Sequence, residues 1–410
     1  MWSSGPLAEL NFRWYFLART VNMIGGTMAS VALAFAVLEI SDSPAALGQV
    51  LAANSIPMVV FLLIGGVIAD RFNRATLMRV CNLLAGLSQG ASAILVLTGR
   101  AELWHLVALS ALNGTVFAVS LPAMSSVLPQ LVPREHLQQA NVLVSMMRGA
   151  LTILGPSTAG VIVVAFSPGW ALAVDAASWL LSAAILLGVR IPSRLRGSSP
   201  TSTLADLKAG WSLFIGHTWL WVVVLAFGAL NAIHAGAWST LGPALAKDTI
   251  GERGWGLALS AEAAGLLLMT VILLKARFQR PLLAGMLGCS LFSLPLVALG
   301  LDPSLVVILV AAFIAGMGME IFGIGWNLAM QENIDESMLS RAYSYDMLGS
   351  FVAIPVGQLL FGPLGERWGV QDVILWAGVA YAAICLLTLT SASVRRLSRG
   401  EVSTTSAPAS

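Results

Sequence analysis

The amino-acid sequence predicts an all-α membrane protein with twelve transmembrane helices arranged as two six-helix repeats. Three observations lead to this prediction. Of the 410 residues, 57% are hydrophobic and 10% are charged, whereas about 25% charged residues are usual in a soluble domain. Apolar runs of membrane-spanning length recur along the chain, and residues in its two halves match at a constant offset.

Twelve apolar runs of roughly 18–25 residues, the length that crosses a bilayer, follow one another along the chain. We expect the helices near 14–39, 46–69, 75–98, 103–125, 140–166, 170–189, 218–243, 254–274, 282–301, 304–328, 343–366 and 370–390. Some contain proline, for example Pro57, Pro156 and Pro295. Membrane helices tolerate such breaks because neighbouring groups satisfy the freed backbone.

Lys and Arg predict the orientation, since they are enriched in cytoplasmic loops. With the N-terminus inside, 18 of the 22 basic residues fall on the cytoplasmic side, and 4 fall outside: Arg100, Lys247, Arg253 and Arg367. We therefore expect a multi-pass protein of the cell membrane (inner or plasma membrane) with both termini in the cytoplasm.

The repeat has an offset of 202 residues. At this offset Gly155 matches Gly357, and Gly160 matches Gly362. Single identities among small residues mean little, but the register holds without a gap from the third predicted helix to the eleventh. Two halves that repeat in parallel are therefore expected.

The expected domains follow from this repeat. We expect an N-terminal six-helix bundle over 1–190, a cytoplasmic linker over 191–209 and a C-terminal six-helix bundle over 210–392. The small polar residues at 393–410 predict a disordered cytoplasmic tail.

Several function classes are excluded by what the sequence lacks. The net charge of +2 gives no reason to expect a nucleic-acid partner, and the three cysteines have no metal-ligand spacing. No phosphate loop of the form GxxxxGK[ST] is present, so ATP is not the direct energy source. We expect no cofactor, no metal and no enzymatic activity.

The loop between the second and third predicted helices carries Gly66, Ala69, Asp70, Arg71 and Arg74. This segment resembles the signature G-x-L-A-D-R-x-G-R-[RK] of the major facilitator superfamily. The resemblance implies the major facilitator fold and a gate on the cytoplasmic side.

The acid of this loop follows the C-terminal end of a helix, where a carboxylate is repelled by the helix dipole. We expect Asp70 to bind the start of the eleventh helix, near Asp346, when the protein faces outward, because helix N-termini attract anions. Arg71 and Arg74 supply nearby cations.

Shorter motifs resemble one branch of that superfamily. Gly155, Pro156 and Gly160 form a shortened version of the Gly-Pro motif of antiporters, although ordinary tight packing is an alternative. Asp175 and Trp179 fit the start of the sixth helix in the same branch. Together these residues resemble exporters of the enterobactin and macrolide type.

Ionisable residues inside a membrane are costly and are functional candidates by default. Glu320 lies deepest, among Gly316, Gly318 and Gly323, and is the first candidate for proton coupling. Glu262 is the reserve candidate. A carboxyl in such a span can change its protonation state when its exposure to water changes; a protonated group that only stabilises a neighbour is the alternative.

Other polar residues within the predicted helices are candidates for lining a cavity: Asn22, Asn113, Arg148, Asn231 and His234. Arg148 is also a possible partner of Glu320. For Arg19 we favour a side chain that snorkels to the interface.

The sequence thus predicts a secondary transporter that exports a small amphipathic organic compound, such as a drug, a macrolide or a siderophore-like molecule. Proton antiport is implied by the resemblance. The expected partners are this substrate, protons and the lipid bilayer, and a monomer is expected. The alternatives are an importer or lysolipid transporter of the same fold, or a transporter-like sensor or scaffold that moves nothing.

Overall fold

The structure is a computed structural model. It describes residues 5–71, 73–190, 211–212, 214–274, 278–301 and 304–398, apart from the side chains at 62–71, 122–123, 125–126, 129, 336–337 and 340–341. The expected linker at 191–209 and the tail from 399 onward therefore lie outside the described residues. The earlier part of the expected tail includes a helical turn, α17 (Ala392–Arg395).

The N-terminal half, called the N-half below, contains the first six long helices. They are α1 (Leu10–Ser41), α2 (Pro44–Arg71), α3 (Arg74–Leu97), α4 (Leu103–Val127), α5 (Leu137–Ala165) and α6 (Pro168–Ile185). A short 3-10 helix, η1 (Pro6–Ala8), precedes them.

The C-terminal half, called the C-half, contains six more membrane-length segments, three of which are interrupted. The first joins α8 (Thr218–Ile233), the π-helix η5 (His234–Leu241) and α9 (Gly242–Asp248). The others are α10 (Gly251–Leu273), α11 (Pro281–Ser290) with α12 (Ser293–Leu301), α13 (Leu305–Asn333), α14 (Glu336–Phe351) with α15 (Ala353–Trp368), and α16 (Val370–Thr388).

These bounds agree with the offset of the sequence repeat. Adding 202 to the bounds of α6 gives 370–387, and α16 runs from Val370–Thr388. Adding 202 to the bounds of α4 gives 305–329, and α13 runs from Leu305–Asn333. The predicted all-α fold of two six-helix repeats is confirmed.

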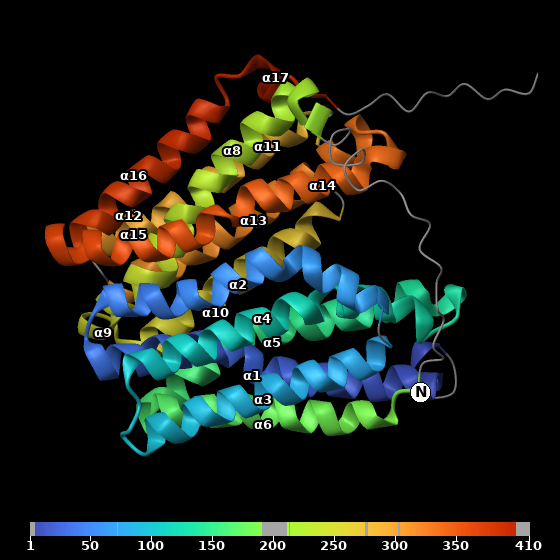
Figure 1. The fold of residues 1–410 in the computed structure, drawn as a ribbon. Coiled ribbons are helices and arrows are strands. Elements are labelled where there is room, and N and C mark those ends of the chain that lie inside the picture. The colour runs from blue at the N-terminus through green and yellow to red at the C-terminus, as the bar shows by residue number, and fades with distance from the viewer. Residues whose placement is uncertain are drawn as a thin grey trace, which may run out of the picture.

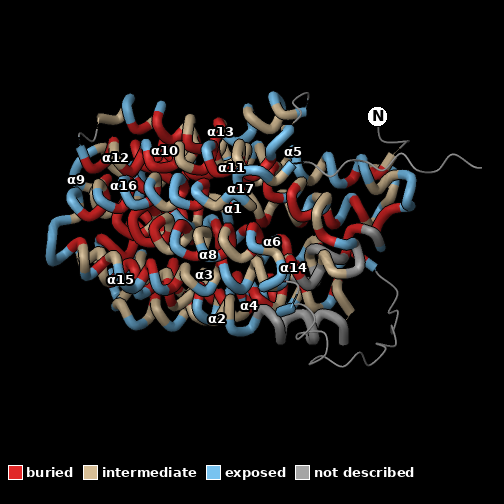
Figure 2. The backbone as a smooth tube through the Cα atoms, turned by 90° about the horizontal axis from the view of Figure 1, so that it is seen from above, coloured by how far each residue is buried: buried red, intermediate tan, exposed pale blue. Residues whose placement is uncertain are grey.

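Twelve helices of the described part are long and apolar enough to cross a membrane. Large apolar side chains are exposed along many of them, for example Leu225, Val306 and Trp376. Figure 2 shows the buried residues concentrated inside the bundle and the exposed ones along its outside. Such a surface suits contact with lipid chains.

The chain alternates between two ends of the bundle. The end at which α1 begins and α16 stops is called the termini end below, and the other is called the opposite end. Figure 1 shows the ribbons of the two halves close together around α9, α12 and α15 at the opposite end, and diverging toward the termini end. In the described residues, α14 packs on α8 of its own half, whereas α15 packs on α2 of the other half.

Candidate functional site

Two pairs of helices join the halves, and glycines allow their close approach. In the pair α5 and α10, a Cβ built at Gly160 would lie 2.9 Å from the Glu252 carbonyl oxygen. In the pair α2 and α15, a Cβ built at Gly362 would lie 2.5 Å from Ala45 Cα. Both glycines therefore sit where the backbone of the other half leaves no room for a side chain.

The matching glycines five residues earlier make close contacts within each half. A Cβ at Gly155 would collide with Thr27 of α1, and one at Gly357 would collide with Ala232 of α8. The Gly-Pro motif of α5 is thus a packing surface that faces α1 on one side and α10 on the other. Its partner motif in α15 makes the equivalent contacts with α8 and α2.

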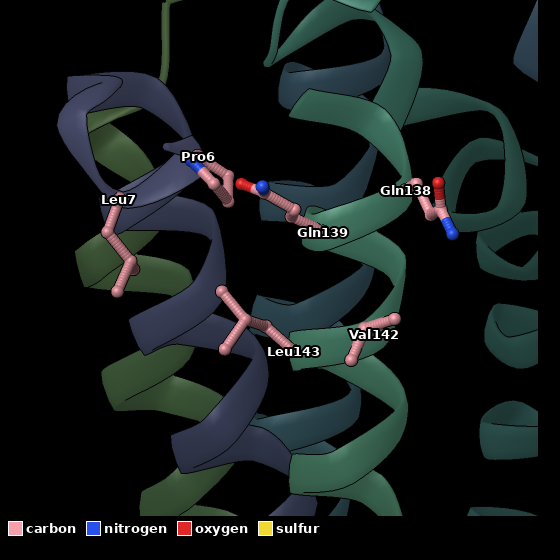
Figure 3. Close-up of a pocket in the computed structure, with 6 residues that line it drawn as sticks. All are labelled: Pro6, Leu7, Gln138, Gln139, Val142 and Leu143. Carbon is pink, nitrogen blue, oxygen red and sulfur yellow. The ribbon is translucent and has the colours of Figure 1, made fainter. Parts of the chain in front are cut away.

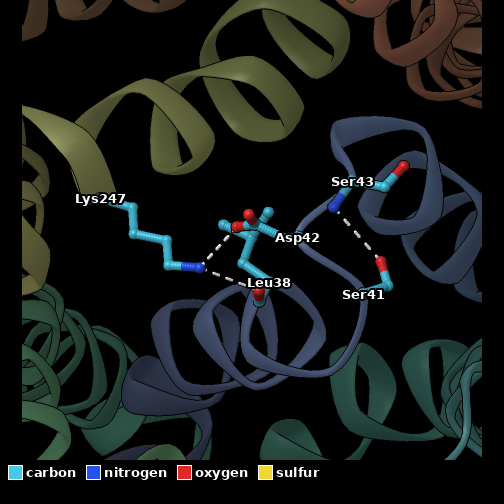
Figure 4. Close-up of polar contacts among 5 residues, drawn as sticks. All are labelled: Leu38, Ser41, Asp42, Ser43 and Lys247. Atoms are coloured by element: carbon cyan, nitrogen blue, oxygen red, sulfur yellow. Dashed lines mark hydrogen bonds and ion pairs between the residues drawn. The ribbon is translucent and has the colours of Figure 1, made fainter.

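Polar contacts between the halves gather toward the opposite end. Lys247 Nζ lies 2.7 Å from Asp42 Oδ1 and donates a hydrogen bond to the Leu38 carbonyl at 3.0 Å (Figure 4). Nearby, the Glu366 carboxylate of α15 accepts hydrogen bonds from Ser43 Oγ at 2.5 Å and from the Ala45 backbone N–H at 3.3 Å. We call these contacts the end latch.

Two further contacts lie deeper in the same interface. Ser157 of α5 and Ser260 of α10 form a hydrogen bond of 2.6 Å between their hydroxyl oxygens. Ser55 of α2 donates to the Gln358 side chain of α15. The described conformation is therefore held closed at the opposite end.

The predicted gate at the termini end is only partly described. Gly66 lies in α2, the side chains of Asp70 and Arg71 are not among those described, and Arg74 begins α3. Asp346 is bound inside its own half: it accepts hydrogen bonds from Trp326 Nε1 at 3.0 Å and from Ser350 Oγ at 3.2 Å. A partnership with Asp70 stays a prediction.

The two carboxyl candidates lie on neighbouring helices. Glu320 of α13 is half-buried, and its Oε1 lies 2.8 Å from Thr270 Oγ1 of α10. Glu262 lies eight residues before Thr270 on α10, roughly 12 Å nearer the opposite end. It lies near Trp238, whose buried indole N–H has no hydrogen-bond partner in the described part of the chain.

Three of the cavity candidates serve helix packing. The Asn113 amide donates to Ser88 Oγ at 2.9 Å, between α4 and α3. The Asn231 amide donates to the Ser350 carbonyl at 3.0 Å. The ring of His234 packs against Phe292, with centroids 4.9 Å apart.

The other two candidates belong to a basic region of the N-half. Asn22 of α1 is buried, and its Nδ2 has no hydrogen-bond partner in the described part of the chain. Arg19 extends among the helices of the N-half, with Nη1 3.6 Å from Met124 Sδ. Arg148 of α5 is exposed and repels Arg19 electrostatically. No ion pair joins Arg148 and Glu320 in the described residues.

Comparison with known proteins gives the family of this two-half helical bundle. Residues 15–357 match the family described as Major Facilitator Superfamily. The chain belongs to the major facilitator superfamily. The resemblance read from the loop signature is confirmed, and the family and fold are those of transporters rather than enzymes.

Relatives from this superfamily align over most of the chain. The uncharacterized transporter YfiS of Bacillus subtilis is 27% identical, with 91% of each chain covered. Macrolide efflux protein A of Streptococcus pyogenes is 21% identical over 95% of this chain and 98% of its own. The enterobactin exporter EntS of Shigella boydii is 24% identical over 86% and 85%.

Solved structures of the superfamily share the fold. The nucleoside transporter NupG has a TM-score of 0.71 at 13% identity and covers 92% of this chain and 98% of its own. A bacterial homologue of the lysosomal transporter Spinster, inward-facing and unoccupied, has a TM-score of 0.69 at 15% identity, with 92% and 95% covered.

A pocket of about 360 Å³ lies at the termini end of the N-half. Figure 3 shows it between η1 and the start of α5, lined by residues such as Leu7, Gln139 and Val142. None of the predicted site residues lines this pocket, so we do not connect it with the transport chemistry expected of a major facilitator protein.

Sequence reasoning did not identify the end latch. Asp42, Lys247 and Glu366 are ordinary loop-proximal charges in the sequence, and their partners lie 205 and 323 positions away. The only sequence feature that pointed to these contacts was that all three residues are predicted on the less basic side of the membrane. Pairing them requires knowing how α9 lies against the end of α1 and how α15 lies against α2, which one sequence does not contain.

Proposed function

We propose that this chain is a secondary active transporter that exports a small amphipathic organic compound from the cell in exchange for protons. The observation that carries the proposal is the unequal packing of the two halves, which are latched at one end and diverge at the other. Transport by alternating access requires this arrangement, because one end must be closed while the other admits the substrate.

The proposed direction of transport rests on the orientation of the chain in the membrane and on the names of its relatives. If the termini end is cytoplasmic, as the distribution of Lys and Arg predicts, the two halves diverge toward the cytoplasm. An exporter loads its substrate in that conformation. Two relatives that align with most of the chain are named for efflux or export, which favours export over import. The solved structures are similar only in fold and carry no direction.

Glu320 is our first choice for the coupling group. It shares one face of α13 with Gly316, Gly323 and Asn327, at helical spacing. A Cβ built at Gly323 would meet no atom within 4 Å, and Asn327 is exposed. The face of α13 that carries Glu320 therefore borders open space one turn away, at Gly323. The carboxyl itself bonds to Thr270 of α10, so movement of α13 against α10 would change its access to water.

The test replaces the carboxyl. A panel of antibiotics and dyes, tested in a host without its own pumps, first identifies a substrate. In proteoliposomes, Glu320→Gln should then abolish uphill transport driven by a pH gradient while exchange down a substrate gradient continues, because a neutral amide cannot carry a proton.

Two variants make this test specific. Glu135→Gln removes an exposed carboxyl outside the bundle and should leave transport unchanged. Glu262→Gln tests the reserve candidate. If Glu320→Gln still builds a substrate gradient that a protonophore collapses, Glu320 is not the coupling group.

A further inference from the structure

A small polar cavity lies among the helices of the N-half. It has a volume of about 10 Å³ and is lined by side chains of α1, α3, α4 and α6, among them Arg19, Asn22, Asn82, Met124 and Ser182. A cavity of roughly this size accommodates one water molecule or one oxygen atom of a larger group.

Arg19 brings a positive charge to this cavity without a negative partner among the described residues. Its guanidinium contacts Met124 Sδ and lies near Tyr15. The charged group that acts on it is Arg148, which repels it. The ion pairs found in the described residues, Lys247–Asp42 and His136–Glu135, lie elsewhere. A half-buried guanidinium normally pairs with a carboxylate, because desolvating a lone charge is costly.

Asn22 adds a second unsatisfied donor to the same cavity. It is 7% exposed, and its Nδ2 meets no hydrogen-bond partner in the part of the chain that the structure describes. Because it follows Arg19 by three residues on α1, both side chains point to one side of the helix. A buried amide N–H without an acceptor is rare in folded proteins.

The remaining polar groups of the cavity do not supply the missing acceptor. The Asn82 amide already donates to Ser182 Oγ at 2.9 Å. A water molecule would satisfy Asn22, but it would leave the charge of the half-buried Arg19 uncompensated. An anionic oxygen satisfies both requirements, because it accepts from the amide and neutralises the guanidinium.

We propose that Arg19 and Asn22 form a subsite for an anionic oxygen group, such as a carboxylate, of the organic compound that the protein transports. This inference rests on the proposed function, because it takes the bound compound to be the one that is transported. It narrows the substrate class to organic anions and zwitterions and makes a purely cationic amine a poor substrate.

Binding to the purified protein tests this subsite without a transport assay. The probes are benzoate, benzamide and benzylammonium, which have similar size and differ in charge. The three cysteines are free and buried, so a thiol-reactive dye reports thermal unfolding in their presence. We expect benzoate to bind on the order of tenfold more tightly than benzamide, and benzylammonium not to stabilise the protein.

Variants test whether the preference for benzoate over benzamide arises at Arg19 and Asn22. Arg19→Gln should reduce the ratio of benzoate to benzamide affinity to about one, since the charge-assisted bond is lost. Arg13→Gln removes the same charge from an exposed position of the same helix and should keep the ratio. Asn22→Asp places a carboxylate beside Arg19, so it should raise the unfolding temperature without ligand and remove the advantage of benzoate.

Three results would overturn the proposal. Wild-type protein could bind benzoate and benzamide equally, Arg19→Gln could keep the preference, or Arg13→Gln could lose it as fully as Arg19→Gln. If Arg19→Gln fails to fold, Asn22→Asp takes its place, and a preference for benzoate that persists in Asn22→Asp would also overturn the proposal. Export of neutral or cationic compounds would remain possible after each of these results, so failure here is distinct from failure of the proposed function.

Discussion

At the scale of single residues, the end latch gives the clearest link between geometry and transport. Lys247 joins Asp42 and the Leu38 carbonyl across the halves, and Glu366 accepts from the first turn of α2. An anion at a helix N-terminus is favourable because of the helix dipole. In the proposed alternating-access cycle, both contacts must break before the opposite end opens, so their strength would set part of the balance between the two conformations.

Asp42→Asn should therefore favour opening of the opposite end. Asp42 has a left-handed backbone with φ of 51°, which Asn tolerates. The pair is exposed, with 83% of the Asp42 side chain accessible, so its loss should shift the population by a factor of roughly 1.4 to 5, equivalent to about 0.2–1 kcal/mol.

The shift can be measured with a cysteine at Thr240, which is buried in η5 and lies beside the position of Gly48 on α2. A membrane-impermeant maleimide added to cells should label Thr240→Cys faster when combined with Asp42→Asn. Asp372→Asn, which removes an acid at the start of α16, should not change the rate. An equal rate in all three backgrounds would mean that the latch does not control opening.

At the scale of helices, the repeat explains why glycines occur in pairs in α5 and α15. The first member of each pair faces a helix of its own half, and the second faces the other half. The sequence revealed that these glycines match at an offset of 202 residues. It left open whether they bend their own helix or allow it to pack closely against other helices. The contacts of the described conformation favour packing.

Gly362→Ala should destabilise closure of the opposite end. The added Cβ would lie 2.5 Å from Ala45 Cα, so the helices α2 and α15 must move apart. Alanine stabilises a helix by about 1 kcal/mol relative to glycine. A loss of transport would therefore reflect the lost close packing of α2 on α15 and not a weaker helix.

Gly90→Ala provides the matched control, since its Cβ would meet Ala176 Cβ at an ordinary 3.8 Å within the N-half. We expect faster labelling of Thr240→Cys and slower transport in Gly362→Ala, and neither effect in Gly90→Ala. Wild-type rates in Gly362→Ala would show that close contact between α2 and α15 is not required.

At the scale of the whole molecule, apolar length and the repeat were sufficient to predict the fold. The twelve spans follow from local composition, which each segment carries by itself, and the two-half organisation follows from the matches at an offset of 202 residues. The site was less predictable. The sequence placed Glu320 and Asn22 inside helices, but whether each meets a partner depends on contacts between distant helices. Asn113 and Asn231 form hydrogen bonds with neighbouring helices. The periodicity of one helix cannot distinguish an asparagine that bonds to a neighbouring helix from one that lines a cavity.

Motion of the halves against each other can be tested at the contact between α5 and α10. Ser157 and Ser260 come from different halves, and their hydroxyl oxygens are 2.6 Å apart. Cysteines at both positions should form a disulfide on mild oxidation, because a disulfide needs its two side chains in direct contact. The bond would hold α5 against α10 and keep the opposite end closed.

Oxidation of the double variant Ser157→Cys with Ser260→Cys should stop transport, and a reductant should restore it. The single variants, oxidised in the same way, should transport at the rate of the wild type, which separates the effect of the bond from that of the substitutions. Mass spectrometry gives the fraction of protein that is cross-linked. If fully cross-linked protein still transports, the two halves do not separate between α5 and α10 during the cycle, and alternating access by rocking of the halves is wrong for this protein.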